Sequence, residues 1–486
     1  MLVGIIMIPY YISNLGAESY GLVGFFSLLS TWMNLLDMGM TPTLSREVSA
    51  ARGKKNGMFA FQKLLRSFEI IFFCTSIIVF VLIFIFRNWL SSEWIKSSEL
   101  SSIEIAKCII IMGVLLGLRW FSTLYRSIIV GFELQVALNI INIVFSSLKF
   151  IAVLLVFKFI SNDIFVFFEY QLLLGIIEVL ILTYFVYSKF TKHRFKIPIL
   201  FFDWPSIKSV MPFTLGFAYS STIWILVSQV DKLILSGILN LTEFGYFNLV
   251  IVVSSTITTL ASPISQAILP RMVYLFSINC KEEMINLYKS ATQLVTIVSG
   301  SLMMVIAIYS ENIIYAWTGN LEAAKWAKNV LFWYALGNGV LAILTFQHYL
   351  QVAIGQLKLQ VFGGTMSVII DVPLIIFFSF NYGAVSTGIV WFLLRIFWFL
   401  FWTPYVHNKY IPKMHVKWAI NDVFIILVSI IISALLLNYI FPVVSTNRFL
   451  IFFHLSIIGL IVLICGGLAS SFIRNKIFLF LRTKTI

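Results

Sequence analysis

Two arginines stand inside an apolar segment that is long enough to cross a bilayer. Arg119 and Arg126 lie within residues 116–132, LGLRWFSTLYRSIIVGF. On a helix, residues seven apart project within about 20° of each other and lie about 10 Å apart along the axis. Guanidinium groups are well suited to binding phosphate and carboxylate groups. The pair therefore predicts a cationic stripe that binds an anionic group inside the membrane.

Three further cations stand inside apolar segments and extend this stripe into a candidate substrate pathway. They are Lys149, Lys232 and Arg395. Positive side chains along a low-dielectric route lower the barrier for a negatively charged group. Arg119 is expected near mid-membrane and Arg126 two turns closer to the cytoplasmic end.

Each cation also has an interpretation without a role in transport. Arg126 would serve as an anchor if its long side chain reached the cytoplasmic interface. For Arg119, Lys149 and Arg395 the alternative is a structural ion pair. The carboxylates available for such pairs are Glu178, Glu169 and Asp371.

Buried carboxylates raise the question of energy coupling, since they can bind a proton or a sodium ion in turn with substrate. The candidates are Asp37, Glu178, Asp231 and Asp371. Lys232 is expected to reach the periplasmic interface while Asp231 faces the helix bundle, because helix neighbours point about 100° apart. Pro373 follows Asp371 closely and would bend the helix or free carbonyls for a cation. A bend without an ion explains the same pattern.

Composition places these charges in a membrane protein. Of the 486 residues, 60% are apolar and 11% are charged, and the mean hydropathy is +0.98; an ordinary soluble domain is about 25% charged. The apolar runs are continuous, as in residues 70–86 and 423–441, which favours spanning helices over a barrel. The four cysteines and five histidines are scattered, so neither a disulfide framework nor a metal site is expected. The fold class is all-α, integral to the membrane and polytopic.

Apolar runs and the polar breaks between them predict about fourteen transmembrane helices. Their approximate spans are 1–12, 21–44, 67–87, 106–130, 137–158, 164–187, 209–236, 244–268, 288–310, 327–350, 359–380, 384–405, 419–441 and 449–471. The first is too short, because twelve residues rise about 18 Å and the hydrocarbon core is about 30 Å thick. Either residues upstream of Met1 complete it, or it enters the bilayer only partly.

Basic residues in the loops predict the orientation. Alternate loops hold 22 and 7 lysines and arginines, and the richer set is cytoplasmic if both termini are cytoplasmic. A basic cytoplasmic face also explains the net charge of +14, so a nucleic-acid partner is not expected.

The chain contains an internal echo about 225 residues apart. The segments NLGAESYGLVGFFSLL (14–29) and NLTEFGYFNLVIVV (240–253) each place an aromatic–glycine pair, ending at Gly21 and Gly245, at the start of an apolar helix. Six helices intervene, so the copies point the same way. This predicts two six-helix bundles facing a central cavity, plus two C-terminal helices. Chance similarity in apolar sequence is the alternative.

Four segments resemble the polysaccharide-biosynthesis membrane proteins, the O-antigen repeat-unit flippases (Wzx-type) of the multidrug/oligosaccharidyl-lipid/polysaccharide exporter (MOP) superfamily. They are residues 15–50, 118–135, 229–249 and 262–272, and the likeness runs to about residue 410. It implies an N-terminal six-helix bundle over 1–200, a second over 201–410, and two added helices with a basic cytoplasmic tail over 411–486.

The resemblance implies a flippase that moves an undecaprenyl-diphosphate-linked oligosaccharide from the cytoplasmic to the periplasmic leaflet of a bacterial inner membrane by alternating access. It implies no cofactor beyond a proton or sodium gradient, and the pathway's polymerase and chain-length regulator as partners. A lipid II flippase and a multidrug or cation antiporter share the fold. A membrane polymerase or glycosyltransferase is disfavoured, because no catalytic constellation and no large extracytoplasmic loop are found.

Overall fold

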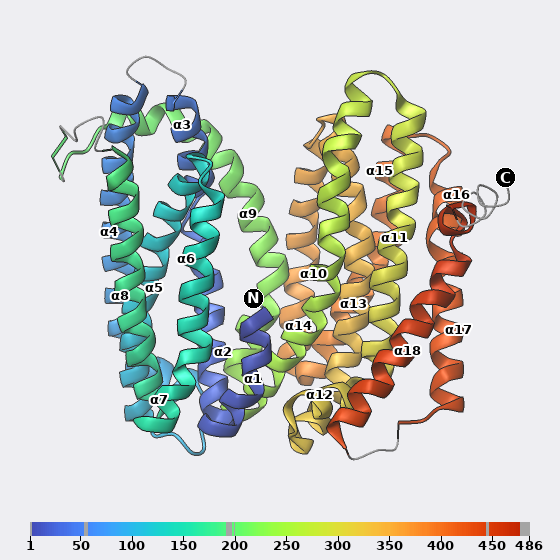
Figure 1. Ribbon diagram of the computed structural model, residues 1–486, viewed down its shortest axis with the longest axis horizontal. Coiled ribbons are helices and arrows are strands. Elements are labelled where there is room, and N and C mark those ends of the chain that lie inside the picture. Colours follow the sequence, from blue (N-terminus) through green and yellow to red (C-terminus); the bar gives the residue numbers. More distant parts are fainter. Residues whose placement is uncertain (1, 53–56, 191–196, 199, 444–446, 477–486) are drawn as a thin grey trace. The chain divides into compact units, whose positions relative to one another are not determined.

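The structure is a computed structural model that describes the chain apart from residues 1, 53–56, 191–196, 199, 444–446 and 477–486. Every long element in the described chain is a helix (Figure 1). The α-helices are α1 (Leu2–Leu15), α2 (Ala17–Trp32), α3 (Met40–Arg52), α4 (Gly57–Trp89), α5 (Ser102–Gly131), α6 (Gln135–Ser147), α7 (Val153–Phe159), α8 (Ile164–Phe190), α9 (Trp204–Ile238), α10 (Leu241–Ser277), α11 (Lys281–Ile308), α12 (Ser310–Thr318), α13 (Leu321–Ile354), α14 (Lys358–Phe397), α15 (Thr403–Tyr410), α16 (His415–Trp418), α17 (Ile425–Ile440) and α18 (Arg448–Ala469).

In the described residues, five short segments continue these helices with other hydrogen-bond patterns. One is the 3₁₀ turn η1 (Met33–Leu35), and four are π-helical: η2 (Leu90–Trp94), η3 (Leu148–Ala152), η5 (Trp398–Trp402) and η6 (Ala419–Phe424). Single π-turns inside α-helices often mark functional positions.

The described residues contain 11 helices long and apolar enough to cross a membrane, or up to 12 if the bent pair α2–α3 is one span. The expected count of about fourteen differs for two reasons. Helix α1 has 14 residues, too few to span the core alone. The expected spans 359–380 and 384–405 form one helical run, Lys358–Tyr410, which reverses at Gly383, where φ is 73° and ψ is −160°.

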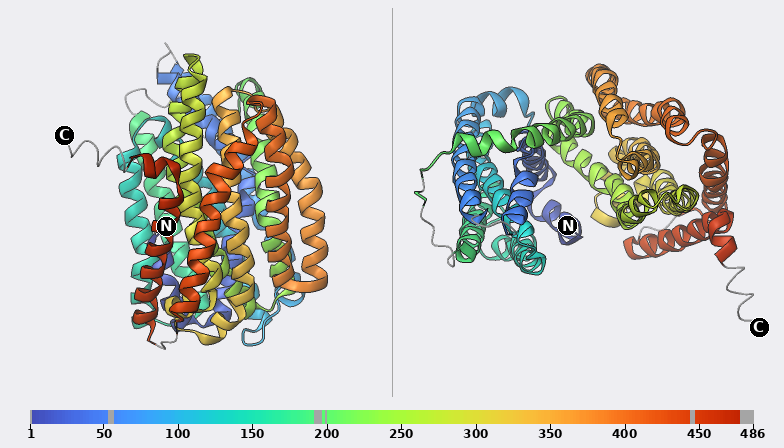
Figure 2. Two further views of the ribbon diagram at one scale, coloured as in Figure 1. Left: turned by 90° about the vertical axis from the view of Figure 1, so that its right-hand side faces the viewer. Right: turned by 90° about the horizontal axis from the view of Figure 1, so that it is seen from above.

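Contacts divide the chain into two compact units, an N-terminal unit (Met1–Gly245) and a C-terminal unit (Tyr246–Ile486). Within each unit the long helices lie side by side (Figure 2). In the N-terminal unit α5 packs against α4 and α8, and in the C-terminal unit α13 packs against α11 and α14. The predicted boundary at residue 200 follows from the number of helices along the chain, whereas these two units are defined by contacts within each of them. The predicted division into bundles over 1–200 and 201–410 therefore stays a prediction.

The second predicted helix, 21–44, is not continuous, which corrects the position of Asp37. Helices α2 and α3 are bent by 56° across the break between Leu35 and Met40. Asp37 lies in this break, and its carboxylate accepts hydrogen bonds from the Thr41 backbone N–H at 3.3 Å and from the Thr41 hydroxyl. Asp37 therefore caps the start of α3. Gly39 adopts a φ of 73°, which a residue with a side chain rarely takes.

The two glycines of the internal echo meet within the N-terminal unit, where the first turns of α2 and α10 touch. A Cβ atom added to Gly21 would lie 2.0 Å from the Leu241 carbonyl oxygen, and one added to Gly245 would lie 2.7 Å from that of Ala17. Both positions therefore require glycine, because the backbones approach too closely for a side chain. The repeated motif has a packing role in both copies.

The last two long helices, α17 and α18, pack against α11. Gln293 on α11 holds them through its buried amide. The amide nitrogen donates to Asp422 at 2.6 Å and to Ser471 at 3.0 Å, and the amide oxygen accepts from the Phe472 N–H at 3.0 Å. A buried network satisfied in this way fixes one arrangement of the helices.

Candidate functional site

Glu178 is the centre of a charged group inside the N-terminal unit. It lies on α8, and its side chain is 4% exposed. One carboxylate oxygen accepts a hydrogen bond from Arg126 on α5, and the other accepts from Lys149 in η3. A buried carboxylate is retained only when it is paired and hydrogen-bonded, and here it has two cations.

Arg119 lies seven residues before Arg126 on α5, about two turns away on the same side of the helix, and has a different environment. Its guanidinium donates to the Ser30 hydroxyl on α2 at 3.1 Å, and its Cζ atom lies 4.3 Å from the centre of the Phe26 ring. Among the residues that the structure describes, no carboxylate oxygen lies within 4.0 Å of it, since none of the ion pairs includes Arg119. A hydroxyl and an aromatic face hold this cation in position without neutralising it.

Arg119, Arg126 and Lys149 around Glu178 form the cationic cluster, which has three positive charges and one negative charge. Its members come from α5, η3 and α8. Positive charge in excess within the membrane favours an anionic ligand. The cluster can bind and orient such a group; it holds no nucleophile beside a base.

The local sequence explains how Lys149 reaches Glu178. Lys149 lies in a π-turn, where one extra residue changes the direction of the side chains. Asn142, seven residues earlier on α6, accepts a hydrogen bond from Arg126. Asn142, Ser30 and Phe26 are not among the residues predicted from the sequence. The seven-residue spacing from Asn142 to Lys149 was the available signal.

A second buried polar group lies on α4, α5 and α8. Glu69 accepts hydrogen bonds from Arg66 at 2.8 Å, from Tyr125 at 3.0 Å and from Tyr187 at 2.6 Å. Arg66 also contacts the Tyr187 hydroxyl. This group is not part of the predicted site, although Arg66 and Glu69 are spaced i and i+3. It contains one cation and one carboxylate, so it is electrically balanced.

The C-terminal unit holds a balanced pair on the two arms of α14. Arg395 donates to Asp371 at 3.2 Å, with side-chain exposures of 6% and 0%. The other Asp371 oxygen accepts from the Trp398 indole at 2.9 Å, and the Arg395 guanidinium lies 4.2 Å from the centre of the Trp391 ring. The ion-pair interpretation therefore describes the geometry of Arg395. Pro373 lies inside the first arm without a break in the helix.

The remaining predicted residues lie elsewhere in the N-terminal unit. Asp231 on α9 is 2% exposed. The Lys232 ammonium donates to the Ser228 carbonyl at 2.7 Å and to the Gln229 side chain at 2.9 Å, so it points back along α9. Its place at the periplasmic interface stays a prediction. Within the described chain, no group of three or more His, Cys, Asp or Glu side chains is placed to hold a metal ion.

The sequence of residues 1–276 matches the family model described as polysaccharide biosynthesis protein, which is more than half of the chain. The chain belongs to the polysaccharide biosynthesis protein family. The matched region includes the whole cationic cluster and ends before Asp371 and Arg395. Among curated proteins, none matches the sequence.

Solved structures show the fold of this polysaccharide biosynthesis protein. The lipid II flippase MurJ, in an inward closed conformation, covers 98% of this chain and 97% of its own length, at a TM-score of 0.70 and 15% identity. An inward-facing multidrug resistance MATE family transporter of the MOP superfamily covers 85% of this chain and 96% of its own length. Its TM-score is 0.65 and its sequence identity is 14%. A MOP superfamily transporter from Pyrococcus furiosus, described by the reverse polarity of its binding pocket, covers 84% of this chain and 94% of its own length. Its TM-score is 0.53 and its sequence identity is 14%.

The polysaccharide biosynthesis protein is thus an all-helical, multi-pass membrane protein with the fold of MOP superfamily transporters. At these identities the likeness concerns the fold, and the ligand has to be inferred from the chain's own side chains.

Proposed function

We propose that this polysaccharide biosynthesis protein is a flippase that moves an undecaprenyl-diphosphate-linked oligosaccharide from the cytoplasmic to the outer leaflet of a bacterial cytoplasmic membrane. Both termini lie on the cytoplasmic side in this proposal, and the two units alternate between inward and outward access. A proton or sodium gradient drives the cycle, with Glu178 and Asp231 as the buried carboxylates available for coupling.

The single observation that carries the proposal is the excess charge of the cationic cluster. A diphosphate headgroup that is esterified at both ends carries one negative charge on each phosphate into a low-dielectric region. One opposite charge at 4 Å contributes about 4 kcal/mol at an effective dielectric constant of 20. Arg119 has no carboxylate within 4.0 Å among the described residues, so it retains its charge for the headgroup. Arg126 and Lys149 share one carboxylate and keep a net charge of their own.

A cation or drug antiporter would use the same fold, but this cluster would repel a cationic substrate. Lipid II carries the same diphosphate-linked polyprenyl anchor as an oligosaccharide repeat unit, so the cluster supports the whole class of diphosphate-linked glycolipids. Family membership favours a polysaccharide precursor over lipid II.

The test is transport by Arg119 variants in proteoliposomes. A fluorescent undecaprenyl-diphosphate-linked saccharide is placed in the inner leaflet, and its appearance in the outer leaflet is followed by chemical quenching. We expect Arg119→Ala to lower the initial rate at least about tenfold, equivalent to about 1.4 kcal/mol, because the charge nearest mid-membrane is lost. Arg119→Lys should recover part of the rate, since it keeps the charge and loses the planar fork.

Lys107→Ala is the matched control, because Lys107 lies on the same helix and is exposed. An unchanged rate for Arg119→Ala would overturn the proposal. A lipid II analogue transported as fast as the repeat-unit saccharide would assign the protein to lipid II instead.

A further inference from the structure

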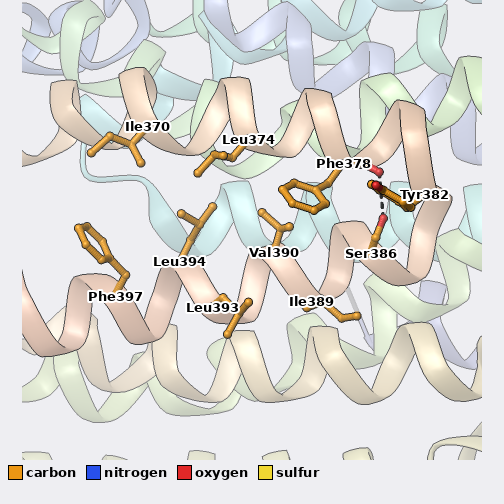
Figure 3. Close-up of a pocket in the computed structure, with 10 residues that line it drawn as sticks. All are labelled: Ile370, Leu374, Phe378, Tyr382, Ser386, Ile389, Val390, Leu393, Leu394 and Phe397. Atoms are coloured by element: carbon orange, nitrogen blue, oxygen red, sulfur yellow. Dashed lines mark hydrogen bonds between the residues drawn. The ribbon is translucent and has the colours of Figure 1, made fainter.

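A groove and a polar network lie outside the cationic cluster. The groove runs between the two arms of α14, and its lining residues are uncharged (Figure 3), so it adds no charge to the proposed pathway. The network lies in the N-terminal unit, on helices that also carry the cationic cluster. Its members, which together form the Glu69 network, are Arg66, Glu69, Tyr125 and Tyr187. The shared helices relate this network to the anion-binding site.

Glu69 on α4 is the common acceptor of the Glu69 network. Its Oε1 atom accepts hydrogen bonds from the Tyr125 hydroxyl on α5 at 3.0 Å and from the Tyr187 hydroxyl on α8 at 2.6 Å. Its Oε2 atom accepts a hydrogen bond from Arg66, which lies three residues earlier on α4, at 2.8 Å. A single carboxylate therefore ties both α5 and α8 to α4.

The Arg66–Glu69 ion pair is nearly enclosed. The two side chains are 9% and 12% exposed, and the Arg66 guanidinium also contacts the Tyr187 hydroxyl and lies 5.1 Å from the centre of its ring. Removing two charges from water costs free energy that apolar side chains of the same size would not cost. Packing alone therefore does not explain the pair. The hydrogen bonds add a defined direction, because their strength falls steeply with angle.

The Glu69 network and the cationic cluster hold the same two helices. On α5, Tyr125 directly precedes Arg126, and helix neighbours point about 100° apart. Tyr125 contacts Glu69 on α4, whereas Arg126 contacts Glu178 on α8. On α8, Glu178 lies nine residues before Tyr187. Because each helix is held at two side chains that point in different directions, its rotation about its own axis is fixed.

We propose that Glu69 is a positioning residue of the anion site. Through Tyr125 and Tyr187 it sets the rotation of α5 against α8, and so it holds Arg126 where the guanidinium can contact a diphosphate headgroup. A binding group has to be held within about 0.5 Å and 10 to 20° of its working geometry. The inference rests on the proposed function, which supplies the headgroup. Glu69 does not bind the headgroup, because it is an anion that already accepts three hydrogen bonds.

The experiment measures the dissociation constant of undecaprenyl diphosphate for the purified full chain in nanodiscs. Tyr125→Phe and Tyr187→Phe each remove one hydroxyl from the Glu69 network, and they leave the ring and the Arg66–Glu69 ion pair in place. The two variants loosen α5 and α8 separately, so one folded variant is sufficient for the test. Tyr184→Phe is the matched control, because Tyr184 lies on α8, is 77% exposed and is outside the network.

We expect each of the two network variants to weaken binding about threefold to tenfold, because a hydrogen bond to a charged group is lost and the helix that it held can rotate. Tyr184→Phe should leave the dissociation constant unchanged. If the network served folding alone, its loss would lower the unfolding temperature and the yield of folded protein. It would leave the affinity of the folded protein as it was.

A double-mutant cycle with Arg126→Ala tests whether the network acts through Arg126. In the Arg126→Ala background, Tyr125→Phe should change the dissociation constant by less than about twofold, because the guanidinium that the network positions is absent. Arg119 is held separately by Ser30 and Phe26, so it should be little affected by the loss of the Tyr125 hydroxyl.

An unchanged dissociation constant in the folded network variants would overturn the inference. An equal loss of affinity with and without Arg126 would also overturn it. Arg119→Ala separates this failure from failure of the proposed function. If Arg119→Ala leaves undecaprenyl diphosphate binding unchanged, the proposed function is wrong. If Arg119→Ala weakens binding and the network variants do not, only the positioning role of Glu69 is wrong.

Discussion

The cationic cluster in the N-terminal unit and the Arg395–Asp371 pair in the C-terminal unit contain the same kinds of charge in different proportions. The cluster has three cations and one carboxylate. The pair has one of each, and two tryptophans enclose it. The pair is therefore both electrically balanced and enclosed, and the cluster has an excess of positive charge.

Exposure shows what this difference means. In the cluster, the Arg126 and Lys149 side chains are 30% and 17% exposed, whereas Arg395 and Asp371 are 6% and 0% exposed. A balanced pair without access for a ligand is suited to joining the two arms of α14, and an unbalanced, partly accessible cluster is suited to binding an anion. We infer that Arg395 has a structural role and that the substrate pathway depends on the cluster.

The largest effect is expected when one partner of the Arg395–Asp371 pair is removed. Asp371→Leu leaves the Arg395 charge buried without its carboxylate. Removing one partner of a buried pair typically costs about 3 to 5 kcal/mol, so we expect most of the folded protein to be lost. Thermal unfolding and size-exclusion profiles of the purified protein measure this.

The double variant Asp371→Leu with Arg395→Leu should recover most of that stability, because no uncompensated charge remains. Its transport rate should stay within about threefold of the unaltered protein. A folded double variant that does not transport would contradict the structural role and return Arg395 to the pathway.

A smaller and opposite effect is expected in the cluster. Glu178→Gln increases the excess positive charge, so the diphosphate headgroup should bind about fivefold more tightly. Transport should nevertheless slow, because tighter binding in the starting state delays release. Direct binding of undecaprenyl diphosphate and the transport rate are measured on the same protein.

Glu169→Gln is the control, since Glu169 is exposed on the same helix α8. Weaker headgroup binding by Glu178→Gln would mean that Glu178 organises the cations and does not compete with the ligand. The distinction between cluster and pair would then rest on geometry and not on charge balance.

Much of this architecture follows from the sequence, because lipid imposes strong constraints on it. Long apolar runs predicted a helical, multi-pass protein, and rare charges within those runs selected Arg119, Lys149 and Glu178 for attention. The pairing of charges required the structure. Glu178 was one of several available carboxylates, and only the packing of α5, η3 and α8 assigns it to Arg126 and Lys149.

Breaks in helices were the other feature that the apolar pattern could not resolve. Hydropathy is continuous through the α2–α3 break, and the local signals were Gly39 and Pro42, at the start of α3. The π-turn at Lys149 leaves no compositional trace, because it depends on hydrogen bonds and not on residue type.

The smallest effect is expected from Ser30→Ala, which tests how Arg119 is held. Ser30 accepts a hydrogen bond from Arg119 at 3.1 Å and donates its own proton to the Phe26 carbonyl at 2.8 Å. A hydrogen bond of this kind contributes about 0.5 to 1.5 kcal/mol, so we expect transport to fall by about threefold, with little change in thermal stability. Ser27→Ala is the control, because Ser27 is exposed on the same helix.

A double-mutant cycle decides whether Ser30 acts through Arg119. In the Arg119→Ala background, Ser30→Ala should have no further effect, because the guanidinium that Ser30 positions is absent. An equal loss in both backgrounds would show that Ser30 acts independently of Arg119. In that case the Phe26 ring alone positions the cation, and Phe26→Leu should then produce the loss that Ser30→Ala does not.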